Sequence, residues 1–365
     1  MISNQLLQRA IDDISKISGR SLSVMDLDGR TVAAVGESFE ADEENVAAFV
    51  VSQNEEETKG NYFLLKIKED GHDAYVLLVC GNSEGDILTG RMTKYELETL
   101  IKAYREKYDR ESFFKSLLLE NLMLVDIFDR SKRLHIDIEG ERVVFIVRTQ
   151  NKNQDDVIDF VRAAITGGRD NISFAFDQHT VVGIRSIENG ETPETIFKFA
   201  ERLVSGIRHE TGEEPRVAYG SVINDLKDIP RSYREARMAL EVGKIFFTEK
   251  AVNSYASLGI GRLIYQLPLP LCRMYLAEIF GDFSPENLEE ELILTFEQFF
   301  ENSLNVSETA RKLFIHRNTL LYRLEKIEKL TGLDLRRFED AIIFKIAMMV
   351  SKYMQHVDGL KSGIQ

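Results

Sequence analysis

The chain holds one short segment whose polar side chains could recognise double-stranded DNA. Arginine, asparagine and threonine follow one another at 317–319, directly after a histidine, and a tyrosine and two further cations come within the next seven residues. Arginine can form two hydrogen bonds to guanine and asparagine two to adenine, whereas lysine neutralises phosphates. We predict a DNA-contacting surface that consists of Arg317, Asn318, Thr319, Tyr322, Arg323, His316, Arg311, Lys312 and Lys326.

Different roles are expected within this set. Arg317 and Asn318 are the candidates for base contacts, and Thr319 could touch a thymine methyl group or a phosphate. Tyr322 and Arg323, one turn later, would hold a phosphate or a flanking base. The remaining cations would anchor the DNA backbone; they are Arg311, Lys312 and Lys326.

Two helices are needed to position these residues. Leu320, Leu324 and Ile327 recur at helical spacing, so one side of the second helix can be buried while the polar side faces outward. His316 stands where this helix should begin. The first residues of a recognition helix usually contact the bases, which is where the arginine and asparagine lie.

A capping signal marks the start of the preceding helix. Asn305 can cap it, and Glu308 three residues later completes a capping-box pattern. Ala310 is small enough to let the other helix pack closely. Phe314 and Ile315 are apolar and are expected to tuck the turn into the core. The pattern is that of a helix-turn-helix.

Local charge favours the same interpretation. Between Ala310 and Arg337 there are eight basic and three acidic residues, a local charge of +5 in a chain whose net charge is −14. A basic island in an acidic protein is expected at a nucleic-acid contact. An ordinary amphipathic helix pair with a solvated basic face, serving as an assembly surface without DNA, stays open as an alternative.

The amino-acid sequence of this segment resembles that of a known family. The run Thr309-Ala310, Ile315-His316-Arg317-Asn318-Thr319-Leu320 and Tyr322-Arg323-Leu324 is similar to the C-terminal DNA-binding domain of the sugar-diacid and purine-catabolism regulators, the CdaR/PucR family. Upstream, the stretches 217–221 and 230–243 resemble the central GGDEF-like domain of that family. The resemblance implies a Fis-like helix-turn-helix in a transcriptional regulator.

We therefore expect an α+β multidomain protein. Its parts would be a PAS/GAF-like sensor at 1–91, a signalling and dimerisation helix linker at 92–136, a degenerate GGDEF-like (ferredoxin-like) domain at 137–267, a linker at 268–287, and an all-α PucR-type helix-turn-helix bundle at 288–357. The sensor would bind a small-molecule effector. Its identity is unknown, because the diacid-recognition pattern of the family is not visible.

Three segments of the sensor and linker support these expectations. Glu40 to Ser52 is predicted to be a short helix. Asp26-Leu-Asp-Gly29 is predicted to be a turn between two strands, because the further ligands of a calcium loop are missing. Leu97, Ile101, Tyr104 and Tyr108 follow a four-three-four spacing that predicts a coiled-coil seam between two subunits. The alternative is a helix packed on its own domain.

An enzyme is not expected. Diguanylate cyclases carry glycines and paired carboxylates in the hairpin turn of the middle domain, where metal and nucleotide bind. This chain has Phe176-Asp-Gln-His179 there, with Asp177 as the one carboxylate. No catalytic residue, metal site or cofactor is predicted. A nucleotide-binding degenerate cyclase stays open as a further alternative.

Composition gives the expected location. Two cysteines far apart indicate thiols in a reducing compartment, and the first residues lack the pattern of a signal peptide. No apolar run is long enough to span a bilayer, so no membrane partner is expected. We predict a cytoplasmic homodimer or higher homo-oligomer, because two-fold pairing of a small helix-turn-helix matches a palindromic DNA site.

Overall fold

The computed structural model describes residues 2–36, 43–150, 155–165, 171–188, 190–281 and 283–362. The chain forms two compact units, one of residues 1–116 with 132–135 and one of residues 117–131 with 136–365. Within the described residues, no helix combines the length and the apolar character needed to cross a membrane.

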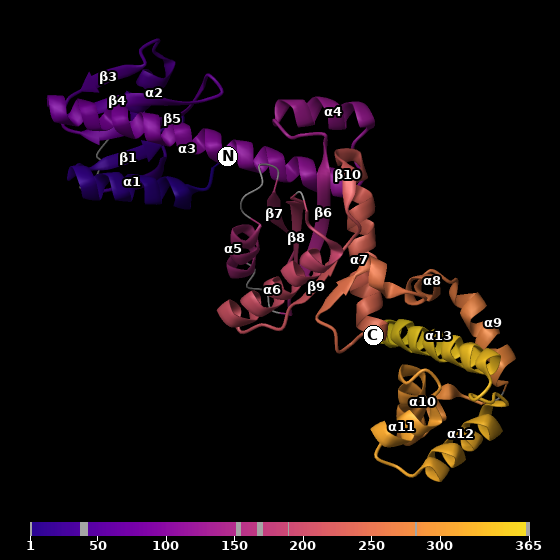
Figure 1. The fold of residues 1–365 in the computed structure, drawn as a ribbon. Helices are drawn as coiled ribbons and strands as arrows, with labels where there is room; N and C mark the ends of the chain where they lie inside the picture. Colours follow the sequence, from indigo (N-terminus) through magenta and orange to yellow (C-terminus); the bar gives the residue numbers. More distant parts are fainter. Residues whose placement is uncertain are drawn as a thin grey trace. The chain divides into compact units, whose positions relative to one another are not determined.

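The first unit is built on a five-stranded antiparallel sheet in the order β2-β1-β5-β4-β3 (Figure 1). Alternation along β4 sends Phe63, Leu65 and Ile67 to one face, where α1 and the first part of α3 cover them. Leu64 points to the other face, which α2 covers. The elements are α1 (Asn4–Ser18), β1 (Leu22–Met25), β2 (Thr31–Val35), α2 (Glu43–Val51), β3 (Glu56–Lys59), β4 (Tyr62–Glu69), β5 (His72–Cys80) and α3 (Glu84–Leu118).

The predicted turn between β1 and β2 is confirmed. The Asp26 carboxylate accepts the backbone N–H groups of Asp28 at 3.0 Å and of Arg30 at 2.8 Å. Gly29 has a φ of 83°, which only glycine adopts without strain. The predicted helix at 40–52 is found as α2, although residues 40–42 lie outside the described part of the chain. Strand β3 was not predicted, because its run of glutamates has no apolar alternation.

The predicted coiled-coil seam on α3 is wrong for its first members. Leu97 and Ile101 are fully buried in the core of the first unit, and Tyr104 packs against the same core. Only Tyr108 is exposed. A helix at the surface of its own domain also repeats apolar residues at three and four, so spacing alone did not distinguish the two arrangements.

The second unit contains a mixed sheet in the order β11-β9-β6-β8-β7, and β10 pairs with β6 beside this path. Helices α5 and α6 pack on one face through Val143, Phe145 and Val147 of β6. On the other face, the Ser232 hydroxyl of α7 accepts the Val144 N–H at 3.2 Å. The elements are α4 (Leu124–Arg133), β6 (Glu139–Arg148), α5 (Asp155–Ala164), β7 (Ile172–Asp177), β8 (Thr180–Ser186), α6 (Pro193–Thr211), β9 (Arg216–Tyr219), β10 (Ile223–Asp225), α7 (Ile229–Phe246) and β11 (Val252–Ser254).

The middle domain thus alternates strands and helices, as expected of an α+β domain, in the order β6-α5-β7-β8-α6-β9-β10-α7-β11. At the β7–β8 turn, the Asp177 carboxylate accepts the backbone N–H of His179 at 2.8 Å. The hairpin turn that carries the signature of a cyclase is thus closed here by an aspartate bound to the backbone.

The C-terminal helices pack around one aromatic and aliphatic core. Phe299 of α10, Leu320, Leu324 and Ile327 of α12, and Phe344 of α13 are all buried in it. The end of α13 continues into a second cluster, where Val350 and its neighbours meet residues of α7, α8 and α9. The helices are α8 (Gly261–Tyr265), α9 (Leu269–Phe280), α10 (Glu290–Glu301), α11 (Val306–Lys312), α12 (Arg317–Thr331) and α13 (Phe338–Ser362).

Candidate nucleic-acid interface

Helices α11 and α12 form the predicted helix-turn-helix, and their caps define its geometry. The Asn305 side chain accepts the backbone N–H of Glu308 at 3.1 Å, which fixes the start of α11. The predicted capping box is wrong in its second half: the Glu308 carboxylate accepts two hydrogen bonds from Arg311, at 2.6 and 2.7 Å, and the Asn305 N–H donates instead to the Asn302 carbonyl at 3.0 Å. Ala310 is buried at the crossing of the two helices, as its size predicted.

The start of α12 presents the predicted base-contacting residues to solvent. His316 is the N-cap, and its Nδ1 accepts the backbone N–H of Asn318 at 3.2 Å. His316, Arg317, Asn318 and Thr319 are all exposed. The opposite side of the helix is held in the core through Leu320, so the exposed residues form the free end of a fixed helix.

The turn between the helices departs from the prediction. Phe314 was expected to tuck into the core, but it is 96% exposed and has a φ of +55°. Ile315 alone turns inward, where it packs against the core of the helical bundle. The backbone hydrogen bond from Ile315 N–H to Ala310 carbonyl, at 3.0 Å, needs the tight turn that forces Phe314 outward.

Two predicted DNA contacts are used to hold α12 against α10. Arg323 is 18% exposed, donates to Glu291 at 2.9 Å and to the hydroxyl of the buried Thr295 at 3.3 Å. Lys326 donates to both oxygens of Glu289 at 2.7 Å, and this bond raises the pKa of Lys326. These ion pairs between α12 and the start of α10 were not predicted from the sequence. The glutamates at 289–291 lie some 30 residues upstream and resemble an ordinary solvated helix start.

The other basic residues of α11 and α12 differ in whether they form ion pairs. Arg311 is committed to Glu308, although it stays largely exposed. Among the described residues, Lys312, Arg317 and Lys329 form no ion pair, and Tyr322 is exposed on the same helix. The cationic groups available to a ligand are therefore concentrated at the end of α11 and along the outer side of α12.

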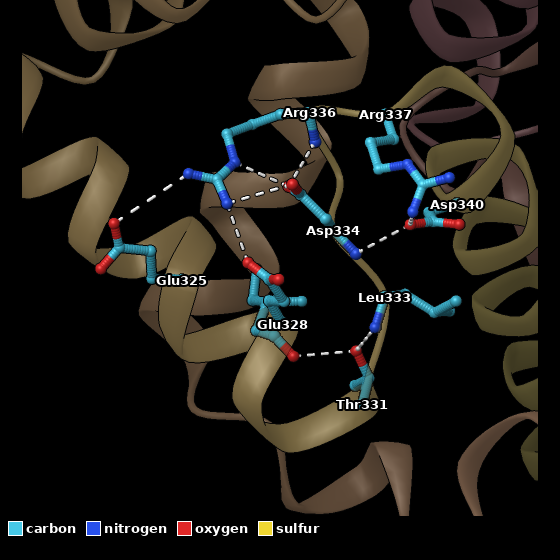
Figure 2. A network of polar contacts seen from close by, with 9 residues as sticks. Glu325, Glu328, Thr331, Leu333, Asp334, Arg336, Arg337 and Asp340 are labelled. Carbon is cyan, nitrogen blue, oxygen red and sulfur yellow. Dashed lines mark hydrogen bonds and ion pairs between the residues drawn. The ribbon is translucent and has the colours of Figure 1, made fainter.

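The far end of α12 is closed by a network around Arg336 (Figure 2). Its guanidinium donates to Asp334 at 2.7 Å and to Glu328 at 2.8 Å, and Glu325 lies at 4.0 Å. Gly332, with a φ of 76°, ends the helix. Arg336 is one of the eight basic residues between 310 and 337, but its charge is used in ion pairs within the fold. The positive charge that is available to a partner is therefore smaller than the local charge of +5.

This network predicts a pH dependence of stability. The hydrogen bond from Arg336 lowers the pKa of Asp334 below its ordinary value of 3.8. A carboxyl group with a lowered folded pKa stabilises the fold above its unfolded pKa and loses that contribution as the pH falls through the folded value. Asp334→Asn should therefore cost roughly 0.5–1 kcal/mol at pH 7, and this cost should shrink as the pH falls below 3.8 and through the lowered pKa of Asp334.

Amide hydrogen exchange of α12 at several pH values would measure this difference. Glu297→Gln, on the exposed side of α10, is the control and should show no such trend. An equal cost of Asp334→Asn at pH 7 and at low pH would contradict the ion-pair explanation.

Two family models match parts of the chain. The PucR C-terminal helix-turn-helix domain matches residues 292–350, which include α11, the turn and α12. The GGDEF-like domain matches residues 122–242, which include the sheet from β6 to β10. The first match contains residues 309–324 and the second contains residues 217–221 and most of 230–243, which carry the resemblance in sequence.

Curated relatives agree with these matches. Purine catabolism regulatory protein of Bacillus subtilis (strain 168) is 24% identical over 227 residues, which cover 60% of this chain and 41% of that protein. Carbohydrate diacid regulator of Escherichia coli (strain K12) is 25% identical over 304 residues, 79% of each chain. DNA-binding transcriptional activator AdeR of Bacillus subtilis (strain 168) is 29% identical over 154 residues, 40% of this chain and 35% of that protein. The chain has the helix-turn-helix and the GGDEF-like domain, and it is similar to these relatives. It therefore belongs to the CdaR/PucR family of transcriptional regulators.

Proposed function

We propose that this regulator binds double-stranded DNA sequence-specifically through the start of α12 and responds to a small molecule bound by its N-terminal unit. One observation carries the DNA-binding part: four polar side chains, 316–319, stand exposed at the N-terminal end of a helix whose opposite side is locked in a core. A helix held in this way can enter the major groove by its N-terminal end without rearrangement.

The contacts divide by what each side chain is free to do. Arg317 pairs with guanine and Asn318 with adenine, and Thr319 meets a thymine methyl group or a phosphate. Lys312 and Tyr322 contact phosphates on either side. Arg323 and Lys326, which were first expected to touch DNA, act instead by positioning α12 on α10.

The sensing part rests on architecture. The sheet of the first unit has its own core on both faces, as an independent PAS/GAF-like sensor would have. The names of relatives, for purine catabolism and for carbohydrate diacids, support small metabolites as the proposed class of effector. We propose a homodimer as the binding species, since a two-fold protein matches a palindromic operator.

Binding to DNA from the region upstream of its own gene tests the DNA-binding proposal. Fluorescence anisotropy of the full chain across a salt series should show binding that resists unrelated competitor DNA and weakens steeply with salt. Equal affinity for operator and unrelated DNA would show a nonspecific surface. No binding, with and without metabolite extracts, would favour an assembly protein.

The salt dependence also separates free from paired lysines. Lys312→Ala should weaken binding to every sequence alike and reduce the slope of log affinity against log salt by about 1, because one phosphate contact is lost. Lys326→Ala is the matched control and should leave the slope nearly unchanged, because its charge is already neutralised by Glu289. A larger change of slope for Lys326→Ala than for Lys312→Ala would show that Lys326 contacts the DNA.

A further inference from the structure

Phe314 is the most exposed large apolar side chain described in the structure. It is 96% exposed, and it lies in the turn between α11 and α12 rather than on a helix face. Its backbone has a φ of +55°, the left-handed region that a bulky side chain rarely adopts. Solvation of an aromatic ring and a left-handed backbone are both unfavourable, and packing of the ring against the described residues does not offset them, since it is 96% exposed.

Asp70, Glu120, His135, Ser303 and Leu304 also have a positive φ, so it is the combination of this backbone with a ring 96% exposed that sets Phe314 apart. Three helix C-caps show the usual solution. The C-caps of α1, α6 and α12 are the glycines Gly19, Gly212 and Gly332, each with a φ near +70°. Glycine at 314 would remove both unfavourable features at the same backbone geometry. A phenylalanine in this place is therefore explained by a partner outside the chain.

We propose that Phe314 packs against the deoxyribose of the DNA backbone at the wall of the major groove. This rests on the proposed function. Phe314 stands two residues before the His316 cap, so it lies just outside the helix end that enters the groove. A residue there meets the groove wall, and deoxyribose is the apolar part of that wall. Lys312 beside it, free of any ion pair among the described residues, faces the adjoining phosphate.

The contact predicts a loss of affinity that differs from the loss of a base or phosphate contact. In the full chain, Phe314→Ala should bind operator and unrelated duplex DNA roughly five- to tenfold more weakly, because the ring area is no longer buried. Sequence preference should not change. The salt slope should not change either, because an uncharged ring displaces no counterion.

Two further variants separate folding from contact. Phe314→Gly should lose affinity as Phe314→Ala does while its melting temperature does not fall, because glycine accepts this φ. Phe338→Ala is the matched control: Phe338 is also exposed in the same helical bundle, but it lies at the start of α13, beyond the far end of α12. It should bind DNA as the unchanged protein does.

Hydroxyl-radical footprinting tests the partner directly, because the radical attacks deoxyribose. The unchanged protein should protect one sugar per half-site that Phe314→Ala leaves open. Unchanged affinity and footprint in Phe314→Ala would overturn the inference while leaving DNA binding intact. A change in association state in sedimentation, with DNA contacts kept, would overturn it as well and assign the ring to a second copy. Absence of DNA binding by the unchanged protein would instead sink the proposed function.

Discussion

Arg317→Ala should reduce affinity for the operator by roughly 5- to 150-fold, which corresponds to about 1–3 kcal/mol for a bidentate contact to a base. Arg317 is the first residue of α12, is exposed and forms no ion pair among the described residues. Its guanidinium is therefore available to DNA without breaking a contact in the free protein. The variant should fold normally, because no internal bond is lost.

The decisive measurement is affinity for a set of operators in which each base pair is changed in turn. The unchanged protein should discriminate strongly at one position per half-site, and Arg317→Ala should discriminate there no longer. Arg273→Ala, an exposed arginine on α9, is the control and should behave as the unchanged protein. A uniform loss on all sequences would show that Arg317 contacts a phosphate, and no loss would show that another face binds.

What could be predicted from the sequence follows from the range of the interactions concerned. The Asn305 cap, the start of α12 at His316 and the burial of Leu320 depend on neighbours within one or two turns, and all three are confirmed. The turn at 26–29 between β1 and β2 is local as well, and it is confirmed. These signals are local in the chain, so residue type and spacing are enough to detect them.

The errors concern choices that spacing does not encode. Leu97 and Ile101 have the spacing of a seam, but the sheet of their own domain was available to bury them. Phe314 is apolar, but the short turn at 313–316 buries only one of two adjacent apolar side chains, and that one is Ile315. The pairing of Arg323 with Glu291 spans 32 residues, and only the packed helices bring the two together.

Arg323→Ala should loosen α12 even when no DNA is present. The side chain donates hydrogen bonds to Glu291 and to Thr295, and Thr295 is fully buried. Loss of a charge-assisted hydrogen bond at a half-exposed carboxylate costs about 1–2 kcal/mol. Amide hydrogen exchange of α12 in the full chain should therefore accelerate by roughly 5- to 30-fold, since this ratio follows from that energy.

Arg311→Ala is the matched control for this prediction. Arg311 also pairs with a glutamate, but it does so three residues away on one exposed helix turn. Such a pair contributes about 0.2–0.5 kcal/mol, so exchange in α12 should hardly change. Equal effects of the two variants would show that the hydrogen bonds of Arg323 between α12 and α10 stabilise α12 no more than an ordinary surface ion pair does.

A double-mutant cycle with Glu291→Gln separates positioning from direct DNA contact. If Arg323 positions α12, Glu291→Gln alone should accelerate exchange, and adding Arg323→Ala should cost less than it does in the unchanged protein. If Arg323 touches a phosphate, exchange in the free protein stays unchanged and Arg323→Ala lowers the salt slope by about 1 in both backgrounds. The buried hydroxyl of Thr295 favours the first outcome, because a guanidinium that leaves for DNA would break the hydrogen bond that it donates to this hydroxyl.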